Sequence, residues 1–149
     1  MSPRERGLFG TRVLYLDDDA DTRDALQTTL QLAGSKVRTA RTARDALQLL
    51  AVEWPEVVIT DLTLPGEDGY AFLGALQKLA GEQGHPVPVM ALTGAAMPED
   101  RQRVSAAGFA LHLTKPVDPT ELVEAVAMTA SGRAREFARK RPQGGGGKE

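Results

Sequence analysis

The stretch Val13-Leu14-Tyr15-Leu16-Asp17-Asp18-Asp19 decides the fold, because a run of apolar, strand-forming residues ends in three consecutive acids. Three later apolar runs also end at a polar residue: residues 57–60 at Asp61, residues 89–92 at Thr93 and residues 110–114 at Lys115. Each run has the length and composition of a buried parallel strand. Because the carboxyl ends of parallel strands share one edge of a sheet, where ligands bind, we expect these polar groups to meet. The sequence therefore predicts a site for a divalent cation and a phosphoryl group.

The bulk composition excludes several classes of protein. The chain has 149 residues, enough for one domain with its own core, and its hydrophobic content of 42% is ordinary for a soluble globular protein. It contains no cysteine, which excludes disulfides, thiolate metal sites and a cysteine nucleophile. No apolar stretch is long enough to span a bilayer, and residues 1–7 lack the apolar segment of a secretory signal. We therefore expect a cytoplasmic protein.

Segments of helical periodicity separate the strand-like runs. We expect a short strand around Val37 and five helices, which run from an Asp21 N-cap to Gly34, from Thr42 to Trp54, from Asp68 to Gly81, from Pro98 to Gly108 and from Asp118 through Ala127. Five β-α units predict an α/β fold, a doubly wound (βα)5 flavodoxin-like arrangement with a parallel five-stranded sheet of order 2-1-3-4-5. That order places the first and third strands side by side and brings Asp17, Asp18 and Asp61 together.

The distribution of charge and glycine divides the chain into three parts. We expect an N-terminal extension over residues 1–10, the folded domain over residues 11–130, and a basic, then Gly-rich, flexible tail over residues 131–149. Six basic and two acidic residues give this tail a charge of +4, so the rest carries −6 within a total of −2. A basic tail can contact nucleic acid or a membrane surface, but its composition favours a solvated helix end and linker. The Gly-rich end is either a terminus or a linker to a further domain.

Five short motifs occur in order on this β-α pattern: Asp17-Asp18, Asp61, Pro65-Gly66-x-Asp68-Gly69, Thr93-Gly94-Ala95 and Lys115-Pro116. No single motif is specific, but the ordered set is. From about Thr11 to Thr129 the chain resembles the receiver domain of two-component response regulators, and it is similar to the single-domain, chemotaxis-type regulators. The resemblance implies a phosphoprotein of bacterial signalling by histidine-to-aspartate phosphorelay.

The resemblance also assigns a role to each residue of the predicted site. It implies that Asp61 is the phosphoacceptor, which takes a phosphoryl group from a histidine kinase or a phosphotransfer protein. Mg²⁺ is the implied cofactor, held directly by Asp18 and Asp61, through water by Asp17, and by the backbone carbonyl of Thr63. Lys115 pairs with Asp61 at rest and with the phosphoryl group afterwards. Because three neighbouring carboxylates repel one another, we expect at least one raised pKa among them when no metal is bound.

Thr93 and His112 are the candidate switch residues. The resemblance implies that Thr93 hydrogen-bonds the phosphoryl group and draws its loop inward. The family often has Tyr or Phe three residues before the lysine, where this chain has His112. That imidazole either takes part in switching or is a partly exposed strand residue with no role. The resemblance also implies a cis peptide bond between Lys115 and Pro116.

The resemblance further implies how the signal leaves the domain. The fourth helix, fifth strand and fifth helix of the predicted fold form the output face for a downstream protein partner of unknown identity. Neither nucleic acid nor a membrane is expected as a partner of this chain, and a homodimer formed on phosphorylation is left open. Such a domain is not an enzyme beyond Mg²⁺-dependent self-phosphorylation and dephosphorylation.

Other functions remain open on the sequence alone. A pseudo-receiver keeps the fold as a phosphorylation-independent interaction module, and a receiver is also found as one part of a hybrid kinase or multidomain regulator. An aspartyl-phosphate phosphatase needs a general acid two residues beyond its nucleophile, where this chain has Thr63. Nucleotide binding is disfavoured because neither glycine-rich phosphate-binding pattern follows a strand. The phosphorylatable receiver is therefore the leading interpretation.

Overall fold

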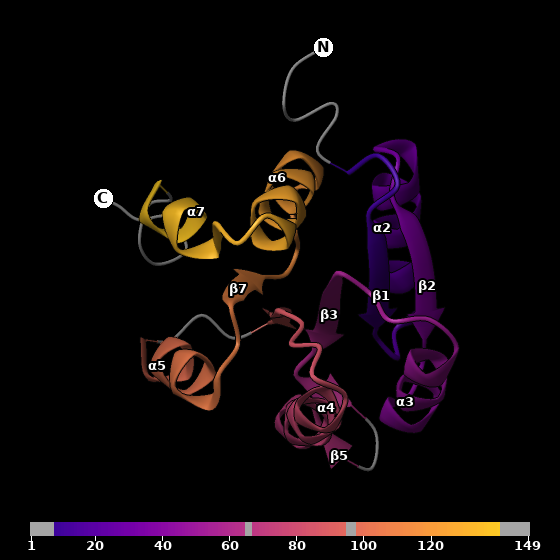
Figure 1. The fold of residues 1–149 in the computed structure, drawn as a ribbon. Helices are drawn as coiled ribbons and strands as arrows, with labels where there is room; N and C mark the ends of the chain where they lie inside the picture. Colours follow the sequence, from indigo (N-terminus) through magenta and orange to yellow (C-terminus); the bar gives the residue numbers. More distant parts are fainter. Residues whose placement is uncertain (1–7, 65–66, 95–97, 141–149) are drawn as a thin grey trace.

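Five parallel strands form the centre of the computed structural model, which describes residues 8–64, 67–94 and 98–140 (Figure 1). The strands are β1 (Arg12–Leu16), β2 (Lys36–Ala40), β3 (Val57–Asp61), β6 (Val89–Thr93) and β7 (Leu111–Thr114). Their order across the sheet is β2-β1-β3-β6-β7, and every neighbouring pair is parallel. Counted along the chain as five strands, this is the predicted order 2-1-3-4-5, which is confirmed.

Apolar side chains cover both faces of the sheet, because successive residues of a strand point to opposite sides. In β1, Val13 and Tyr15 pack into one core cluster, whereas Leu14 and Leu16 pack into the other. All four side chains are almost completely buried. A strand buried on both faces must be apolar throughout, so the continuous apolar runs of the sequence are explained by the helices that cover the sheet.

Six helices surround this sheet in the described part of the chain (Figure 1). They are α2 (Ala20–Leu32), α3 (Ala43–Val52), α4 (Gly69–Gln83), α5 (Pro98–Ala107), α6 (Pro119–Ala130) and α7 (Ala134–Lys140). Residues of α2, α6 and α7 share one core cluster, and residues of α3, α4 and α5 share the cluster on the opposite face. None of the helices in the described ranges is long and apolar enough to cross a membrane.

Two of the predicted N-caps are confirmed and one is wrong. The side chain of Thr42 caps α3, and that of Asp118 caps α6, each by accepting a backbone N–H from the third residue beyond it. Asp21 is not an N-cap, because α2 begins at Ala20 with Asp19 as its N-cap residue. The backbone N–H of Asp19 is held by the carboxylate of Asp17, which starts the helix directly after the acidic run.

A small antiparallel pair, β4 (Thr63–Leu64) with β5 (Glu67–Asp68), lies between β3 and α4 and was not predicted. Strands of two residues are too short to show an alternating pattern in a sequence. The third helix was expected to open at Asp68, and α4 begins at Gly69, directly after it. The motif residues Pro65 and Gly66 lie outside the described residues.

The structure differs from the predicted boundaries at both ends of the domain. Leu8, assigned to the extension over residues 1–10, is fully buried in the cluster beneath α2 and α6. Within the segment predicted as a flexible tail, residues 134–140 form α7, and its Phe137 is only 4% exposed. Phe137 is a single large apolar side chain among charged residues, so this segment shows no helical period of apolar residues. The helix was therefore not predicted from the sequence. The Gly-rich residues 141–149 lie outside the described residues.

We expect Phe137→Ala to lower the free energy of unfolding by about 3 kcal/mol, because it removes a buried ring from the core. Phe9, which is 85% exposed, provides a matched control. Phe9→Ala should change stability by less than about 0.5 kcal/mol. Urea unfolding of the two variants measures both values, and equal losses would show that α7 is not part of the folded unit.

Candidate functional site

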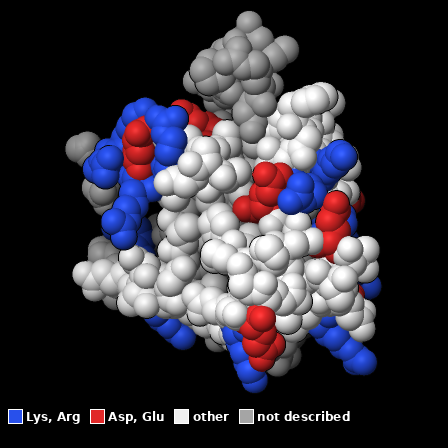
Figure 2. All heavy atoms as spheres, in the orientation of Figure 1, with Lys and Arg blue, Asp and Glu red and all other residues white. Residues whose placement is uncertain are grey.

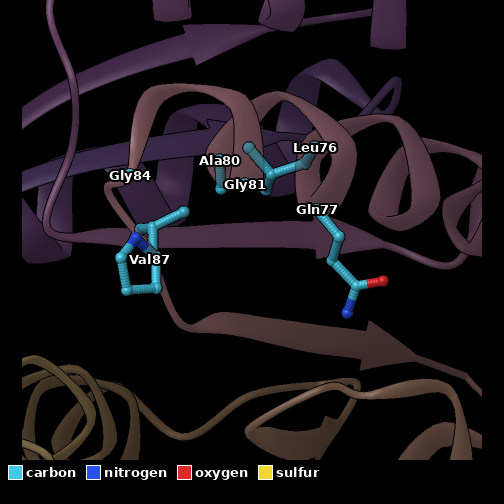
Figure 3. A pocket seen from close by; sticks show the side chains of 7 residues that line it. Leu76, Gln77, Ala80, Gly81, Gly84 and Val87 are labelled. Atoms are coloured by element: carbon cyan, nitrogen blue, oxygen red, sulfur yellow. The ribbon is translucent and has the colours of Figure 1, made fainter.

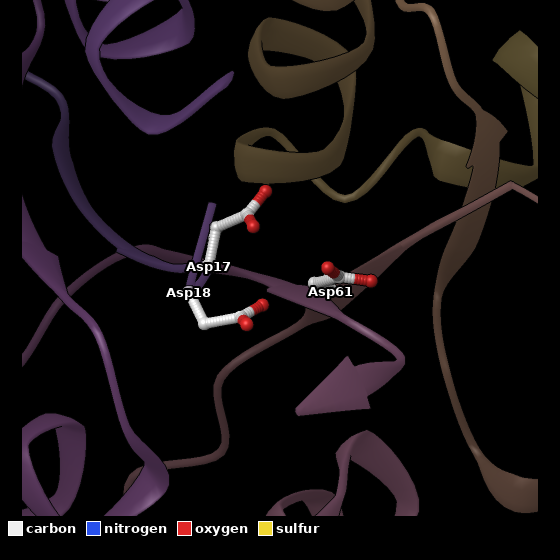
Figure 4. A group of neighbouring side chains, drawn as sticks. All are labelled: Asp17, Asp18 and Asp61. Carbon is white, nitrogen blue, oxygen red and sulfur yellow. The ribbon is translucent and has the colours of Figure 1, made fainter. Parts of the chain in front are cut away.

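Three carboxylates meet at the carboxyl edge of the sheet (Figure 4). Asp17 and Asp18 follow β1, and Asp61 is the last residue of β3. These strands are neighbours, with Leu16 opposite Thr60, so the residues that follow them emerge side by side. An oxygen from each carboxylate lies within 4.8 Å of the others. The structure therefore brings together the acids that the sequence predicted to converge.

The ammonium group of Lys115 joins two of these acids. Its Nζ donates to Oδ2 of Asp17 at 3.0 Å and to Oδ2 of Asp61 at 3.1 Å. The backbone N–H of Lys115 donates to the carbonyl of Thr93 at 2.8 Å, which fixes the lysine against the end of β6. The peptide bond between Lys115 and Pro116 is cis, as the resemblance implied. One cation from the far edge of the sheet thus reaches β1 and β3 together.

Asp17 is completely buried, and protein donors engage both of its carboxylate oxygens. The phenol of Tyr15 donates to Oδ2 at 2.7 Å, and the backbone N–H of Asp19 donates to Oδ1 at 3.0 Å. Burial, followed by the hydrogen bond to Asp17, raises the pKa of Tyr15, so the phenol stays a donor. Sequence reasoning missed Tyr15, although a residue two before Asp17 on a strand points to the same side as that acid.

Asp61 is less enclosed than Asp17, with 8% of its surface exposed. Its Oδ1 accepts the backbone N–H of Thr63 at 3.1 Å, while Oδ2 contacts Lys115. Burial raises the pKa of Asp61, the donors from Thr63 and Lys115 oppose that shift, and the charge of Asp17 adds to it. The expected raised pKa is therefore present, but its largest cause is burial, and repulsion between the acids is a smaller one.

Burial also affects the pKa of Lys115, whose ammonium group contacts Asp17 and Asp61. It lowers the pKa of Lys115, but the hydrogen bonds and charges of Asp17 and Asp61 outweigh it, and the net shift is upward. The lysine therefore stays charged at neutral pH. Asp19 lies at the edge of the group, where its carboxylate accepts the hydroxyl of Thr22 at 2.6 Å, and this bond lowers the pKa of Asp19.

Gly69 supports the loop that carries Asp61, and sequence reasoning gave it only a role in a turn. Its N–H donates to the carbonyl of Leu62 at 2.9 Å. A Cβ at this position would lie 2.8 Å from the backbone oxygen of Asp61 and 2.9 Å from Cα of Leu62. Such distances are shorter than real contacts, so only glycine allows α4 to start this close to the acceptor strand.

The residues of the cluster fit a divalent cation. Three carboxylates and one ammonium group leave a net charge of −2 when all are ionised, and the oxygens of the acids are hard ligands. The acids differ in how accessible they are to an ion. Protein hydrogen-bond donors already occupy both carboxylate oxygens of Asp17, while the side chain of Asp18 is exposed. The donor set and charge suit a hard divalent cation, and Asp18 and Asp61 are the two acids that keep exposed surface.

The remaining predicted residues lie close to this cluster or on the neighbouring strand. Thr93 is buried at the end of β6, where it pairs with Thr114 of β7. His112 lies on β7 opposite Ala91 and is half-buried. Ala95, the last residue of the Thr93 motif, lies outside the described residues. The geometry thus brings Thr93 to the same edge as Lys115 and leaves the role of His112 as a prediction.

Comparison with known proteins identifies the family that this chain resembles. The model of a family described as the response regulator receiver domain matches residues 13–127. The "uncharacterized 14.6 kDa protein in sodA1 3′ region" of Leptolyngbya boryana is 42% identical over 114 residues, covering 76% of this chain and 86% of that protein. The response regulator Rre1 of Synechocystis is 37% identical over 111 residues, covering 74% of this chain. The chain spans only 47% of the length of Rre1.

A solved structure agrees with these relatives. The chemotaxis protein CheY4 of Vibrio cholerae superposes with a TM-score of 0.74 at 30% sequence identity. The match covers 80% of this chain and 98% of CheY4. The part of this chain that resembles CheY4 therefore corresponds to nearly all of that protein.

We expect Gly69→Ala to lower the free energy of unfolding by about 1–3 kcal/mol, because the new methyl group collides with the backbone at Asp61. Gly74 lies on the same helix with nothing within 4 Å of its Cβ position. There the same substitution should stabilise the protein by up to about 1 kcal/mol, since alanine favours helix. Denaturant unfolding measures both, and a loss of stability in both variants would contradict the close approach at Gly69.

The raised pKa of Asp61 sets the direction of a pH dependence. Because the folded protein holds this proton more tightly than the unfolded chain, the contribution of Asp61 to stability is present below the ordinary carboxyl pKa of about 4 and is lost as the pH rises through the folded value. We therefore expect Asp61→Asn to be more stable than the wild type near neutral pH, with the gap closing in acid. Urea unfolding in EDTA across this range measures the gap.

Asp24→Asn serves as the control, because Asp24 is an exposed acid on α2 and surface substitutions usually have small effects. Lys115 keeps Asp17 as a partner in Asp61→Asn, so the ammonium group is not left alone. A wild-type protein that gained stability over Asp61→Asn as the pH rose would contradict the assignment.

Proposed function

The chain belongs to the response regulator receiver domain family, and we propose that it is a phosphorylatable switch that accepts a phosphoryl group on Asp61 from a histidine kinase or a phosphotransfer protein. One observation carries the proposal: Lys115 bridges Asp17 and Asp61 beside Asp18, at the edge of the sheet where ligands bind. Receiver domains are signalling modules, and no catalytic turnover of another substrate is assigned to this chain.

Accessibility favours Asp61 as the acceptor. Asp17 is completely buried and both of its oxygens are engaged by protein donors. Asp61 keeps some exposed surface, and the ammonium group of Lys115 lies beside its Oδ2. An incoming phosphoryl group on Asp61 therefore arrives next to a positive charge, whereas one on Asp17 has no room.

The proposed transfer is a simple displacement at phosphorus. A carboxylate oxygen of Asp61 forms the new P–O bond while the P–N bond of the donor phosphohistidine breaks, and the imidazole nitrogen keeps the electron pair and takes a proton from solvent. Bound Mg²⁺ offsets the negative charge of the carboxylate and the phosphoryl oxygens, and Asp18, Asp61 and the Thr63 carbonyl would hold it. Lys115 then exchanges its contact with Asp61 for one with a phosphoryl oxygen.

We propose that phosphorylation of Asp61 changes the face formed by α5, β7 and α6. The carbonyl of Thr93 accepts the backbone N–H of Lys115, so a change at the lysine reaches the end of β6. From there the Thr93 hydroxyl would turn to the phosphoryl group, with His112 of β7 as the second candidate switch residue. Helix α5 also contacts α4, because the guanidinium carbon of Arg103 lies 4.2 Å from the ring centre of Tyr70.

The size of the complete signalling protein is a separate question. The chain covers most of the Leptolyngbya relative but less than half of Rre1. We propose action by protein contact, either from a receiver alone or from a receiver within a longer regulator or hybrid kinase. A pseudo-receiver without phosphorylation is the alternative, and the intact acid and lysine cluster argues against it.

Intact-protein mass spectrometry after incubation with acetyl phosphate tests the proposal. With Mg²⁺ present, the wild type should gain one phosphoryl mass of roughly 80 Da. The gain should be absent in EDTA and absent in Asp61→Asn, which removes the nucleophile.

Asp24→Asn, which changes an exposed acid of α2, is the matched control and should be modified like the wild type. A gain of mass that persists in Asp61→Asn would place the phosphoryl group elsewhere. No gain from acetyl phosphate or from a panel of phosphorylated histidine kinases would favour the pseudo-receiver.

A further inference from the structure

A groove of about 1050 Å³ lies at the amino-terminal edge of the sheet, away from the carboxylate cluster. Its floor includes Pro86 and Val87, which precede β6, and Phe109, which precedes β7. Helix α7 forms the opposite wall through Arg135 and Arg139. The family match ends at residue 127, so this wall belongs to a part of the chain that the family model does not cover.

The wall of the groove is basic and faces solvent. Arg133, Arg135 and Arg139 line it, and Figure 2 shows the basic side chains of this region gathered at the upper left, over α7 of Figure 1. Glu136 is the acid among the lining residues, and the guanidinium of Arg133 pairs with it. Arg135 and Arg139 are exposed and lie one helical turn apart, so they present two guanidinium groups on the same side of the helix.

The backbone of α7, which carries these arginines, is anchored to the rest of the domain. Phe137 is buried in the core cluster beneath the sheet, and α7 contacts both α6 and β7. A short helix anchored in this way loses little conformational freedom when a partner binds its exposed side. The arginines are therefore a preorganised surface and not a solvated tail.

The remaining lining residues of the groove are uncharged, and most of them are apolar or glycine. Phe109 is 7% exposed, and its ring packs edge-on against Tyr70 with the ring centres 5.7 Å apart. A smaller hollow of about 390 Å³ adjoins the groove, since both are lined by Pro86 and Val87. Figure 3 shows this hollow, where Leu76 and Ala80 of α4 face the segment around Val87, and its described lining carries no charged side chain.

We propose that this groove binds a peptide segment of a partner protein in which acidic and apolar residues are mixed. Its carboxylates pair with Arg135 and Arg139, and its apolar side chains pack on Phe109 and into the hollow beside Val87. The arginines favour a peptide with carboxylates, and the apolar floor favours one that also carries apolar side chains. The site lies at the opposite edge of the sheet from Asp61, and we expect the peptide to bind the unphosphorylated chain.

Nucleic acid fits the groove less well than an acidic peptide. The cations line one wall only, and the lining residues on the opposite side are uncharged. The chain as a whole carries a net charge of −2, which weakens attraction to a polyanion over long distances. Proteins that track a phosphate backbone combine many cations along the path of the strand, which this wall does not offer.

Fluorescence anisotropy of the full chain without phosphodonor tests the proposal. The probe is a fluorescein-labelled peptide in which glutamate, leucine and serine alternate, and the matched probe has glutamine in place of glutamate. The acidic peptide should bind at least about tenfold more tightly than the glutamine peptide, and rising salt should weaken it. A labelled DNA duplex is the third probe, and it should bind more weakly than the acidic peptide.

Three variants locate the binding surface. Arg135→Glu with Arg139→Glu should weaken acidic-peptide binding by about tenfold or more, because two attractive contacts become repulsive. Arg41→Glu with Arg44→Glu makes the same change of charge at exposed positions near the start of α3 and should leave binding unchanged. Ala138→Trp fills the groove without changing the charge and should also weaken binding. Urea unfolding confirms that each variant is folded.

Three results would overturn the proposal. Equal binding of the acidic and glutamine peptides would remove the role of charge. Equal losses of peptide affinity in the α7 and α3 charge variants would show that the net charge of the chain, and not the groove, controls binding. Tighter binding of the DNA duplex than of the acidic peptide would identify nucleic acid as the occupant.

Discussion

The double contact of Lys115 with Asp17 and Asp61 is the interaction on which the rest of the site depends. Three acids at the ends of two adjacent strands repel one another, and the ammonium group offsets one of their charges. The lysine can do this only because β7 follows β6 and β3 in the sheet and the Thr93 carbonyl holds its backbone. The charge that remains, −2 when all four groups are ionised, is the reason that the cluster suits a divalent cation.

The two edges of the sheet serve different purposes in this account. At the carboxyl edge, the strands deliver acids and a lysine whose positions follow from strand order. At the amino edge, the segments that enter β6 and β7 leave an apolar groove, and α7 adds arginines to one side of it. The residues of the first site lie within the range that the family model matches, whereas the second site depends on one buried ring, Phe137, which lies beyond that range. The two sites therefore differ in whether the family model covers the residues that form them.

The sequence predicted the strand order and the convergence of the acids because long apolar runs and ordered motifs are strong signals. It did not predict α7, because one phenylalanine among charged residues carries no periodic pattern. The bond from Tyr15 to Asp17 was missed as well, since strand alternation places the two side chains on one side but does not show that the phenol reaches the carboxylate. The clash behind Gly69 depends on how closely α4 approaches β3, a distance that no local pattern encodes. Tertiary packing sets each of these features.

The most direct test of the central claim is a crystal structure of the protein with Mg²⁺ and trifluoroberyllate, which mimics a phosphoryl group. We expect the ion between the carboxylates of Asp18 and Asp61, and beryllium attached to a carboxylate oxygen of Asp61. We further expect that Nζ of Lys115 contacts a fluorine atom of the mimic. Beryllium attached to another residue, or Mg²⁺ bound away from Asp18 and Asp61, would contradict the account.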